Sequence, residues 1–423
     1  LGAKKKLLVC NQDNFPILLE PGRFPQLRYV DSTDENLILD DIGLWLRQEK
    51  GLKVGRISDQ KQVINDVVGY LFSEIEKIVQ TLKNPEDIIQ KLMLYYEASL
   101  QKREEHRITI PTNLYCFSDK TNMIKKINED TNRINKLSVS LRFLIEYVSA
   151  CPPKNGADIF SIEVFDKLMA LSSLLIQWAN NSDLINYKLA DLKISMLPSG
   201  RLGIAHENDY FSASSTYFRH YSSQTLSNAI DNYESSWQMK DEENSHFIDS
   251  DIIEAFKEEF GVGFYDFTNF IANVFDLGRD IADEVKAVPY KELLDTLISS
   301  GLNRNVVEYI LSILSLKERK KFLEPPKEFR KEDILPWKFN RELSYLRRPF
   351  IIQNETVYWS NRHLYYCGQY LIDLCLGGRL KAKSEKMKNL ISKYQNIKGE
   401  KFNNLVESLF SSFEFLITKS QVK

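Results

Sequence analysis

Apolar residues recur three and four positions apart through most of residues 57–188, and this spacing constrains the fold more than any other feature of the chain. In a helix of 3.6 residues per turn, the spacing collects the apolar side chains on one face, which must be buried against another element. The pattern predicts a bundle or array of four long helices, at about 58–82, 85–101, 122–150 and 161–178. We therefore expect a mainly helical protein, in which the first two of these helices pack as an antiparallel pair.

Outside this bundle the pattern changes to shorter helices and small β-hairpins. Alternating apolar residues around turn-forming residues predict hairpins at 192–204 and 350–359, and a β-branched run predicts a strand at 108–111. The predicted organisation is a mixed segment at 1–56, the long-helix bundle at 57–188, a hairpin with a helical domain at 189–316, a basic linker at 317–348, a hairpin with basic helices at 349–398, and the start of an α/β domain at 399–423.

Composition indicates a folded, soluble chain, with 43% hydrophobic and 27% charged residues. The five cysteines include no CxxC spacing, so neither a disulfide framework nor a zinc site is expected. No stretch approaches the roughly 20 apolar residues of a membrane span. We therefore expect a cytoplasmic protein with no membrane partner and no cofactor within these residues. Because the chain does not begin with Met, we also expect a processed, tagged or trimmed form.

Charge is distributed unevenly along the chain, although the net charge is only −2. Residues 230–260 contain ten acidic residues against two lysines, a local balance of −8, whereas residues 379–401 contain eight basic residues against two glutamates, a local balance of +6. Such blocks are often solvated faces, and they can also serve as interaction surfaces. An acidic face and a basic face on one molecule would allow the protein to bind a partner or to associate with itself.

The last 25 residues of the chain predict a helix followed by a strand that has no partner strand. Gly399 is expected to end one basic helix, and a new amphipathic helix is predicted after it, followed by a strand in which Phe413, Phe415 and Ile417 alternate with other residues. An apolar strand without partners would expose an aggregation-prone edge. We therefore expect further chain or a partner to cover this strand.

This helix and strand resemble the start of the restriction-endonuclease-like fold of the PD-(D/E)XK nucleases. The resemblance rests on Gly399, Phe402, Val406 and Leu409 and covers about the last 25 residues. It implies that a metal-binding Asp and a Glu-x-Lys pair would follow on the next two strands, neither of which is present, so a divalent metal is expected only if such a domain follows. This chain has Asn403 where the family often has an acidic residue. The other interpretation is an ordinary helix and strand at a domain boundary.

Two functional hypotheses follow. The first is a non-catalytic helical region of a larger nuclease-type protein, whose basic C-terminal third contacts DNA or RNA through clustered cations. Aromatic residues among these cations, Trp359, Tyr365 and Tyr366, could stack on unpaired bases. The candidate nucleic-acid-binding residues are Arg347, Arg348, Arg362, Arg379, Lys381, Lys383 and Lys386.

The second hypothesis is a helical protein-interaction or self-assembly module with no nucleic-acid role, which would use the acidic face at 230–260 and the basic face at 379–401. A complete enzyme is the third interpretation. The sequence has no Gly-rich phosphate loop, HExxH, nucleophile elbow or paired-carboxylate motif, so no catalytic or metal-binding residues are assigned.

Overall fold

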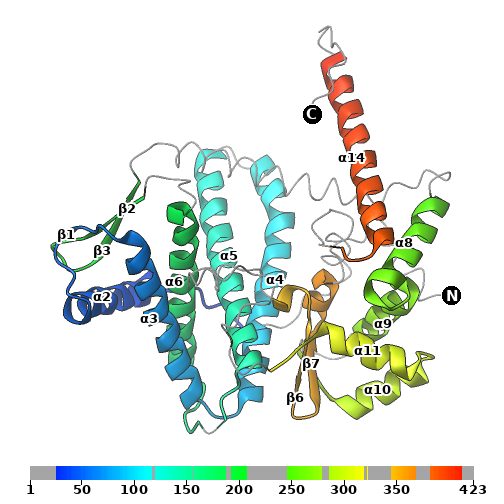
Figure 1. Ribbon diagram of the computed structural model, residues 1–423, viewed down its shortest axis with the longest axis horizontal. Helices are drawn as coiled ribbons and strands as arrows, with labels where there is room; N and C mark the ends of the chain where they lie inside the picture. Colours follow the sequence, from blue (N-terminus) through cyan, green and yellow to red (C-terminus); the bar gives the residue numbers. More distant parts are fainter. Residues whose placement is uncertain are drawn as a thin grey trace.

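Helices dominate the computed structural model, which confirms the predicted fold class (Figure 1). The structure describes residues 25–116, 120–154, 156–186, 192–206, 245–278, 285–318, 322, 344–367 and 382–411. No helix in these ranges is long and apolar enough to cross a membrane. The predicted strand at 413–417 lies outside the described residues. The sequence pattern also favours a strand at 7–10 and a helix at 222–237, and both stretches lie outside the described residues as well.

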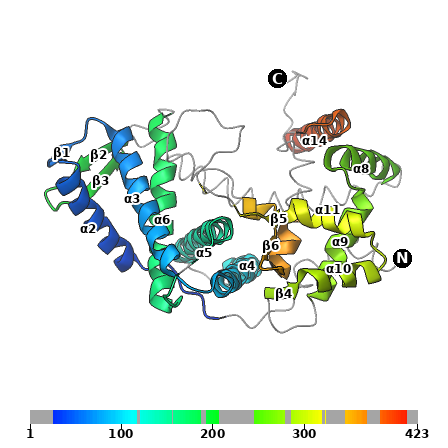
Figure 2. The ribbon, with the colours of Figure 1, turned by 60° about the horizontal axis from the view of Figure 1, so that its bottom comes forward.

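Five helices form the N-terminal bundle: α2 (Ser32–Glu49), α3 (Gln60–Thr81), α4 (Pro85–Cys116), α5 (Lys120–Ala150) and α6 (Ile162–Asn186). Both α2 and α3 pack on α6, α6 packs on α5, and α5 packs on α4 (Figure 2). The expectation that α3 and α4 form an antiparallel pair is wrong, because α3 packs mainly on α6 and α4 packs mainly on α5. A short connection brings two helix ends together, but the apolar faces decide which helices pack along their length.

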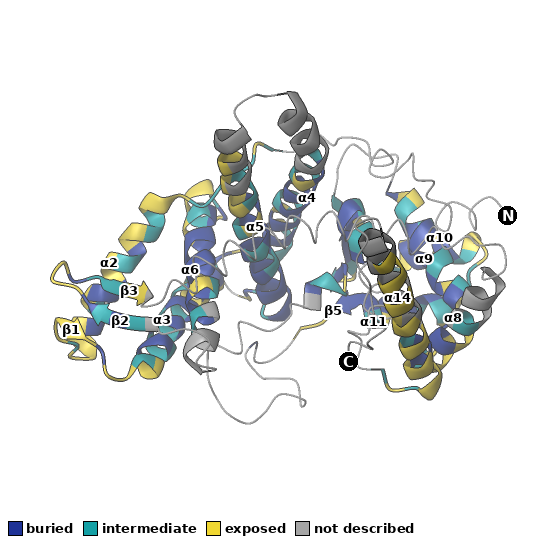
Figure 3. Ribbon diagram, turned by 90° about the horizontal axis from the view of Figure 1, so that it is seen from above, coloured by how far each residue is buried: buried dark blue, intermediate teal, exposed yellow. Residues whose placement is uncertain are grey.

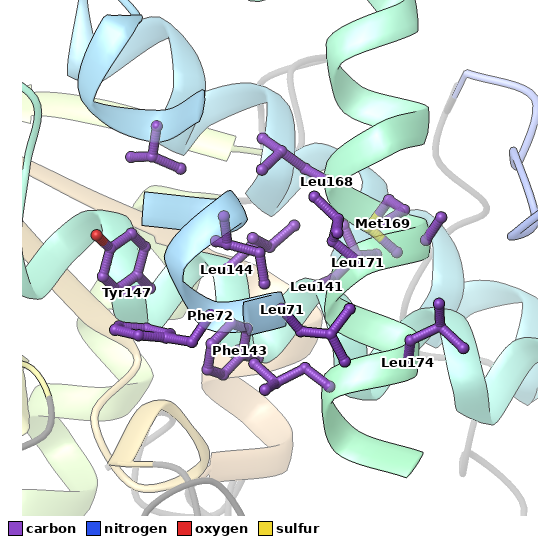
Figure 4. Close-up of a cluster of buried hydrophobic side chains, with 14 of the residues drawn as sticks. Leu71, Phe72, Leu141, Phe143, Leu144, Tyr147, Leu168, Met169, Leu171 and Leu174 are labelled. Atoms are coloured by element: carbon purple, nitrogen blue, oxygen red, sulfur yellow. The ribbon is translucent and has the colours of Figure 1, made fainter. Parts of the chain in front are cut away.

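The bundle core is made by the apolar faces that the spacing predicted. Leu71 of α3, Leu141 and Leu144 of α5, and Leu168 of α6 are fully buried, and Figure 4 shows them gathered in one cluster. Residues from the second half of the chain also join this core, among them Leu316, Phe322, Tyr345, Ile351 and Tyr358. The bundle is therefore completed by chain that lies far away in the sequence.

The predicted strand at 108–111 is wrong. Helix α4 continues through these residues to Cys116, with Pro111 in its last two turns. A run of four β-branched and apolar residues suits a strand only where a partner strand is available, and here α5 runs beside α4 instead. Tertiary packing thus overrides the local preference.

The hairpin predicted near residues 192–204 is confirmed. Strands β2 (Leu192–Met196) and β3 (Leu202–His206) pair in antiparallel fashion, and the two-residue strand β1 (Gly55–Arg56) adds to β2. The hairpin turn contains Gly200 with a φ of 89°. Gly43 of α2 lies directly against this turn, where an added Cβ would meet the Gly200 carbonyl oxygen at 2.0 Å. Both glycines therefore allow the hairpin to pack on the bundle.

The second hairpin is also confirmed, within a larger sheet of strand order β4-β7-β6-β5. Strands β6 (Phe350–Gln353) and β7 (Thr356–Ser360) join through Asn354 and Glu355, whose φ values of 46° and 60° fit the mirror-image turns of hairpins. Strands β4 (Val285–Pro289) and β5 (Ser315–Leu316) were not predicted. They bring chain from the predicted 189–316 segment into one sheet with the 349–398 segment.

Helices cover this second sheet. They are α8 (Ser245–Phe260), α9 (Phe264–Leu277), α10 (Tyr290–Ser299) and α11 (Arg304–Leu314). Their buried faces form a second core with Phe350, Val357 and Trp359 of the sheet. The sequence pattern placed the start of α8 at Asp251, whereas the helix already begins at Ser245. Gly261, with a φ of 71°, directly follows its last residue, Phe260, as a glycine at a helix C-terminus often does.

One long helix, α14 (Glu385–Ser411), closes the described chain. The prediction that Gly399 divides this region into two helices is wrong, because α14 runs through Gly399 without a break. A glycine inside a helix costs only about 1 kcal/mol relative to alanine and does not by itself end the helix. The start of α14 lies beside α8, the rest extends away from the other labelled elements in Figure 1, and much of its surface is exposed in Figure 3. The side chains of Phe402 and Val406 are not described.

Candidate functional site

Buried polar side chains gather where α4 of the bundle meets β7 and the helical segment 361–367. Glu97 and Glu104 come from α4, and Arg362 and His363 follow β7, and all four are at least 94% buried. Tyr345, Tyr366 and Cys367 lie around them, and these seven residues are called the polar junction here. Burying charge is costly unless each group is paired and hydrogen-bonded, so the contacts of these residues decide what the junction can do.

The carboxylate of Glu97 caps the helical segment 361–367. Its Oε1 accepts the backbone N–H of Arg362 at 2.6 Å, and its Oε2 accepts the backbone N–H of His363 at 3.2 Å. A carboxylate in this position satisfies N–H groups that have no partner within a helix and interacts favourably with the helix dipole. Burial nevertheless raises the pKa of Glu97 to about 7, although these hydrogen bonds favour the charged form.

Glu104 binds two partners from the second half of the chain. Its Oε2 accepts a hydrogen bond from Nε of Arg362 at 3.0 Å, and its Oε1 accepts one from the hydroxyl of Tyr366 at 2.8 Å. Glu97 and Glu104 are seven positions apart on α4, about two helical turns, so both face the same neighbour. Arg362 therefore links to α4 through its backbone amide and through its guanidinium.

His363 is held as a neutral ring. Its Nε2 lies 2.8 Å from the Tyr345 carbonyl oxygen, and its ring stacks on the Tyr345 ring with centroids 4.0 Å apart. Burial lowers the pKa of His363 to about 3 and raises the pKa of Cys367 well above its usual value. The Cys367 sulfur lies 3.3 Å from His363 Nε2. Both groups are thus uncharged near neutral pH, unlike the thiolate and imidazolium of a reactive cysteine site.

The geometry of the polar junction fits a connection between the bundle and the second sheet, because its members join α4 to the chain around β7 and all but the half-buried Tyr366 are buried. Among the residues that the structure describes, no cluster of three or more His, Cys, Asp or Glu side chains is arranged to hold a metal ion. The seven residues therefore form a buried structural site whose charge state depends on pH.

The titrations of Glu97 and His363 should oppose each other. The folded state holds the Glu97 proton more tightly than the unfolded chain, so stability is lost as pH rises from about 4.5 to about 7. The folded state resists protonation of His363, so stability is lost as pH falls from 6.5 toward about 3. Between pH 4.5 and 6.5 the two contributions cancel. We expect Glu97→Gln to make the free energy of unfolding rise by about 1.4 kcal/mol per pH unit, relative to wild type, across this window.

His363→Gln is the matched variant. Relative to wild type, it should make the free energy of unfolding fall by a similar amount per pH unit across the same window. Urea unfolding at half-unit pH steps measures both slopes, and the difference from wild type removes the contribution of all other groups. A Glu97→Gln curve parallel to the wild-type curve would mean that Glu97 titrates in its ordinary range.

The structure separates the candidate nucleic-acid-binding residues. Arg362 was expected on a basic surface, and it is buried and paired with Glu104 instead. Arg348 is exposed and Arg347 is half-buried, both near the start of β6. Lys383 and Lys386 are exposed at the start of α14. Arg379 and Lys381 lie outside the described residues. Of the aromatic residues, Trp359 is buried in the second core, and Tyr365 and Tyr366 are half-buried.

The described parts of the acidic and basic faces meet within one chain, in what is called the α8–α14 contact here. Nζ of Lys386 lies 2.9 Å from a Glu254 carboxylate oxygen, and Nζ of Lys393 lies 3.2 Å from an Asp251 carboxylate oxygen. Glu259 accepts backbone N–H groups of Lys383 and Ser384 at 2.7 to 3.0 Å. Burial would raise the pKa of Glu259, but these hydrogen bonds outweigh it and lower the pKa.

Sequence reasoning missed the polar junction. Glu97 lies in an apolar stripe and Glu104 in a charged run that was interpreted as a helix end, so neither pattern indicated a buried partner. The available signal was Glu97 within the apolar stripe of α4, since a carboxylate buried there needs hydrogen-bond donors or a cation opposite. Their partners lie more than 250 positions away, so the pairing itself could not be read from local spacing.

Comparison with known proteins completes the description of the chain. The family model described as Upx-like: Anti-phage protein Upx-like matches residues 29–417, which include all of the bundle, the second sheet and α14. No curated protein and no solved structure matches the chain.

Proposed function

The chain belongs to the Upx-like family of anti-phage proteins, and from this premise we propose that it acts in phage defence as a helical body that holds a basic, nuclease-like C-terminal part against DNA or RNA. The match with the family supports the defence role. The nucleic-acid role is supported by the positive charge at the start of α14. The resemblance to a nuclease domain loses its helix start at Gly399, because α14 runs through that residue, and it keeps only the apolar spacing of Phe402, Val406 and Leu409.

The observation that carries this proposal is the way α14 is held. Its first turns are fixed to α8 by Glu254, Glu259 and Asp251, and its remaining length extends beyond the body (Figure 1). A helix anchored at one end gives whatever follows it a defined position relative to the body. Exposed lysines at the anchored end, Lys383 and Lys386, would then contact nucleic-acid phosphates at the base of α14.

Binding to nucleic acid should depend on these lysines and on salt. We expect the purified protein to bind duplex DNA or RNA with an affinity that falls as salt rises from 50 to 200 mM, because phosphate contacts release counterions. Replacing Lys383, Lys386 and Lys393 with Ala should weaken binding by about tenfold or more and lower the salt slope by about two to three. Fluorescence anisotropy with labelled duplexes measures both quantities.

The control is a triple variant with the same change in charge at the other end of the molecule. Lys53, Lys61 and Lys77 are exposed, lie on or just before α3, and are distant from α14 in Figure 1. Their replacement with Ala should leave affinity within about twofold, and protection of cells against phage should follow the binding data for both triple variants. Equal losses in the two variants would indicate nonspecific attraction to net charge, and absence of binding at low salt would refute the nucleic-acid role.

The second candidate is an interaction or self-assembly module. It is favoured by the α8–α14 contact, since the same pairs could form between two copies if α14 of one chain lay on α8 of another. Light scattering coupled to size exclusion tests this. An assembly that dissociates as salt rises supports self-association, and a constant monomer mass at low and high salt excludes it.

A further inference from the structure

The α8–α14 contact combines an apolar centre with charged edges. Phe256 of α8 and Met387 and Leu390 of α14 are buried in the second core. Around them the pairs run in opposite directions along the two helices, with Asp251 opposite Lys393 and Glu259 opposite the start of α14 at Ser384. The helices are therefore antiparallel, and the carboxylates of α8 follow the basic edge of α14.

These carboxylates bind the groups that a phosphate would bind. Backbone N–H groups at a helix start and lysine ammonium groups are common partners of phosphate oxygens. In this structure Glu259 accepts the N–H groups of Lys383 and Ser384, and Glu254 accepts a hydrogen bond from Lys386. The α8 helix thus presents to α14 a row of negative charges comparable to a short stretch of nucleic-acid backbone.

The charged part of the contact is also easily displaced. The Lys386 and Glu254 side chains are 53% and 64% exposed, and those of Lys393 and Asp251 are 50% and 41% exposed. Exposed pairs such as these are weak and are screened by salt. A polyanion present at high local concentration can therefore compete for the lysines without unfolding the bundle.

We propose that α8 is an internal competitor that covers the basic start of α14 until a nucleic-acid phosphate chain replaces its carboxylates. This inference rests on the proposed function for the identity of the ligand. The displacement exchanges the charged edge contacts of α14 for phosphate contacts, while the apolar centre around Phe256, Met387 and Leu390 keeps the start of α14 on α8.

Hydrogen–deuterium exchange on the full chain tests the displacement. The probes are a 20-base-pair DNA duplex, a double-stranded RNA of the same length, and heparin as a polyanion without bases. Saturating probe should speed the exchange of amides in 251–260 and 385–393 by about threefold or more, while amides of the bundle core in α5 stay unchanged. A saturating probe that leaves 251–260 and 385–393 unchanged overturns the proposal.

Variants of α8 test the competition by removing the carboxylates that would compete with nucleic acid. Glu254→Gln and Asp251→Asn each remove a carboxylate that pairs with a lysine of α14, and each should tighten nucleic-acid binding about twofold to fivefold, because a weak competing pair is lost. Glu292→Gln on α10 removes the same charge from an exposed position away from α14, and it should have no effect. Equal affinities for the wild type and both α8 variants would contradict the competition.

The outcomes separate this proposal from the proposed function. Binding of DNA or RNA without faster exchange in α8 removes the competitor role and leaves the nucleic-acid role intact. Faster exchange in 251–260 and 385–393 with heparin, without binding of DNA or RNA, supports displacement by a polyanion and removes the nucleic-acid role. Absence of binding by all three probes overturns both.

Discussion

Arg362→Ala should lower the free energy of unfolding by about 3–5 kcal/mol, because it leaves the carboxylate of Glu104 buried without its cation. Glu104 is 6% exposed, and its remaining partner in the polar junction is the Tyr366 hydroxyl. A single neutral donor does not compensate a charge that has been removed from water. Chemical unfolding followed by circular dichroism measures the loss, and the polar junction should be among the most sensitive positions in the molecule.

Two further variants define the origin of this effect. The double variant Arg362→Met with Glu104→Gln removes both charges, so it should recover part of the loss, and the resulting cycle reports the coupling between the two residues. Arg304→Ala serves as the matched control, since Arg304 is 55% exposed and its carboxylate partners are 3.6 Å away. It should change stability by less than about 0.5 kcal/mol. A similarly small effect for Arg362→Ala would mean that water reaches Glu104.

Phe322→Ala should destabilise the protein by about 3–5 kcal/mol, the usual cost of emptying a buried aromatic site. Phe322 lies in the segment expected to be a basic linker, yet it is 3% exposed. Its ring is 5.7 Å from that of Phe143 and 5.3 Å from that of Tyr147, in edge-to-face geometry, and it stacks near Phe72. A linker residue would tolerate the change, whereas a core residue would not.

Two control variants in the same unfolding experiment show whether Phe322 is a core residue or a linker residue. Phe322→Leu keeps most of the apolar volume and should cost less than half as much as Phe322→Ala. Leu37→Ala removes an apolar side chain that is 60% exposed on α2 and should change stability by less than about 0.5 kcal/mol. If Phe322→Ala resembles Leu37→Ala, the segment after β5 is not part of the bundle core.

Local spacing predicted most of the elements and few of their partners. The bundle helices and both hairpins were correct because their signals span only a few residues: an apolar stripe for a helix, and alternation around Gly200 or Asn354 for a hairpin. The failures were local signals that packing overrode, such as the strand at 108–111 and the break at Gly399. Strand β5 has only two residues, and β4 has no hairpin turn to mark it, because its partner β7 lies about 70 positions later in the chain; both form because β6 and β7 lie beside them.

The amino-acid sequence by itself determined that this protein is mainly helical, where the four predicted bundle helices begin to within about two residues, and that acidic and basic charge is concentrated in different stretches. Only the tertiary structure decided that α3 packs on α6, that α8 and α14 pair their charges within one chain, and that Arg362 is buried rather than exposed to a phosphate. The physical reason is the distance along the sequence between the residues that interact. Helix periodicity acts over three or four residues, whereas Arg362 meets Glu104 across 258 positions, and only the folded chain brings such residues together.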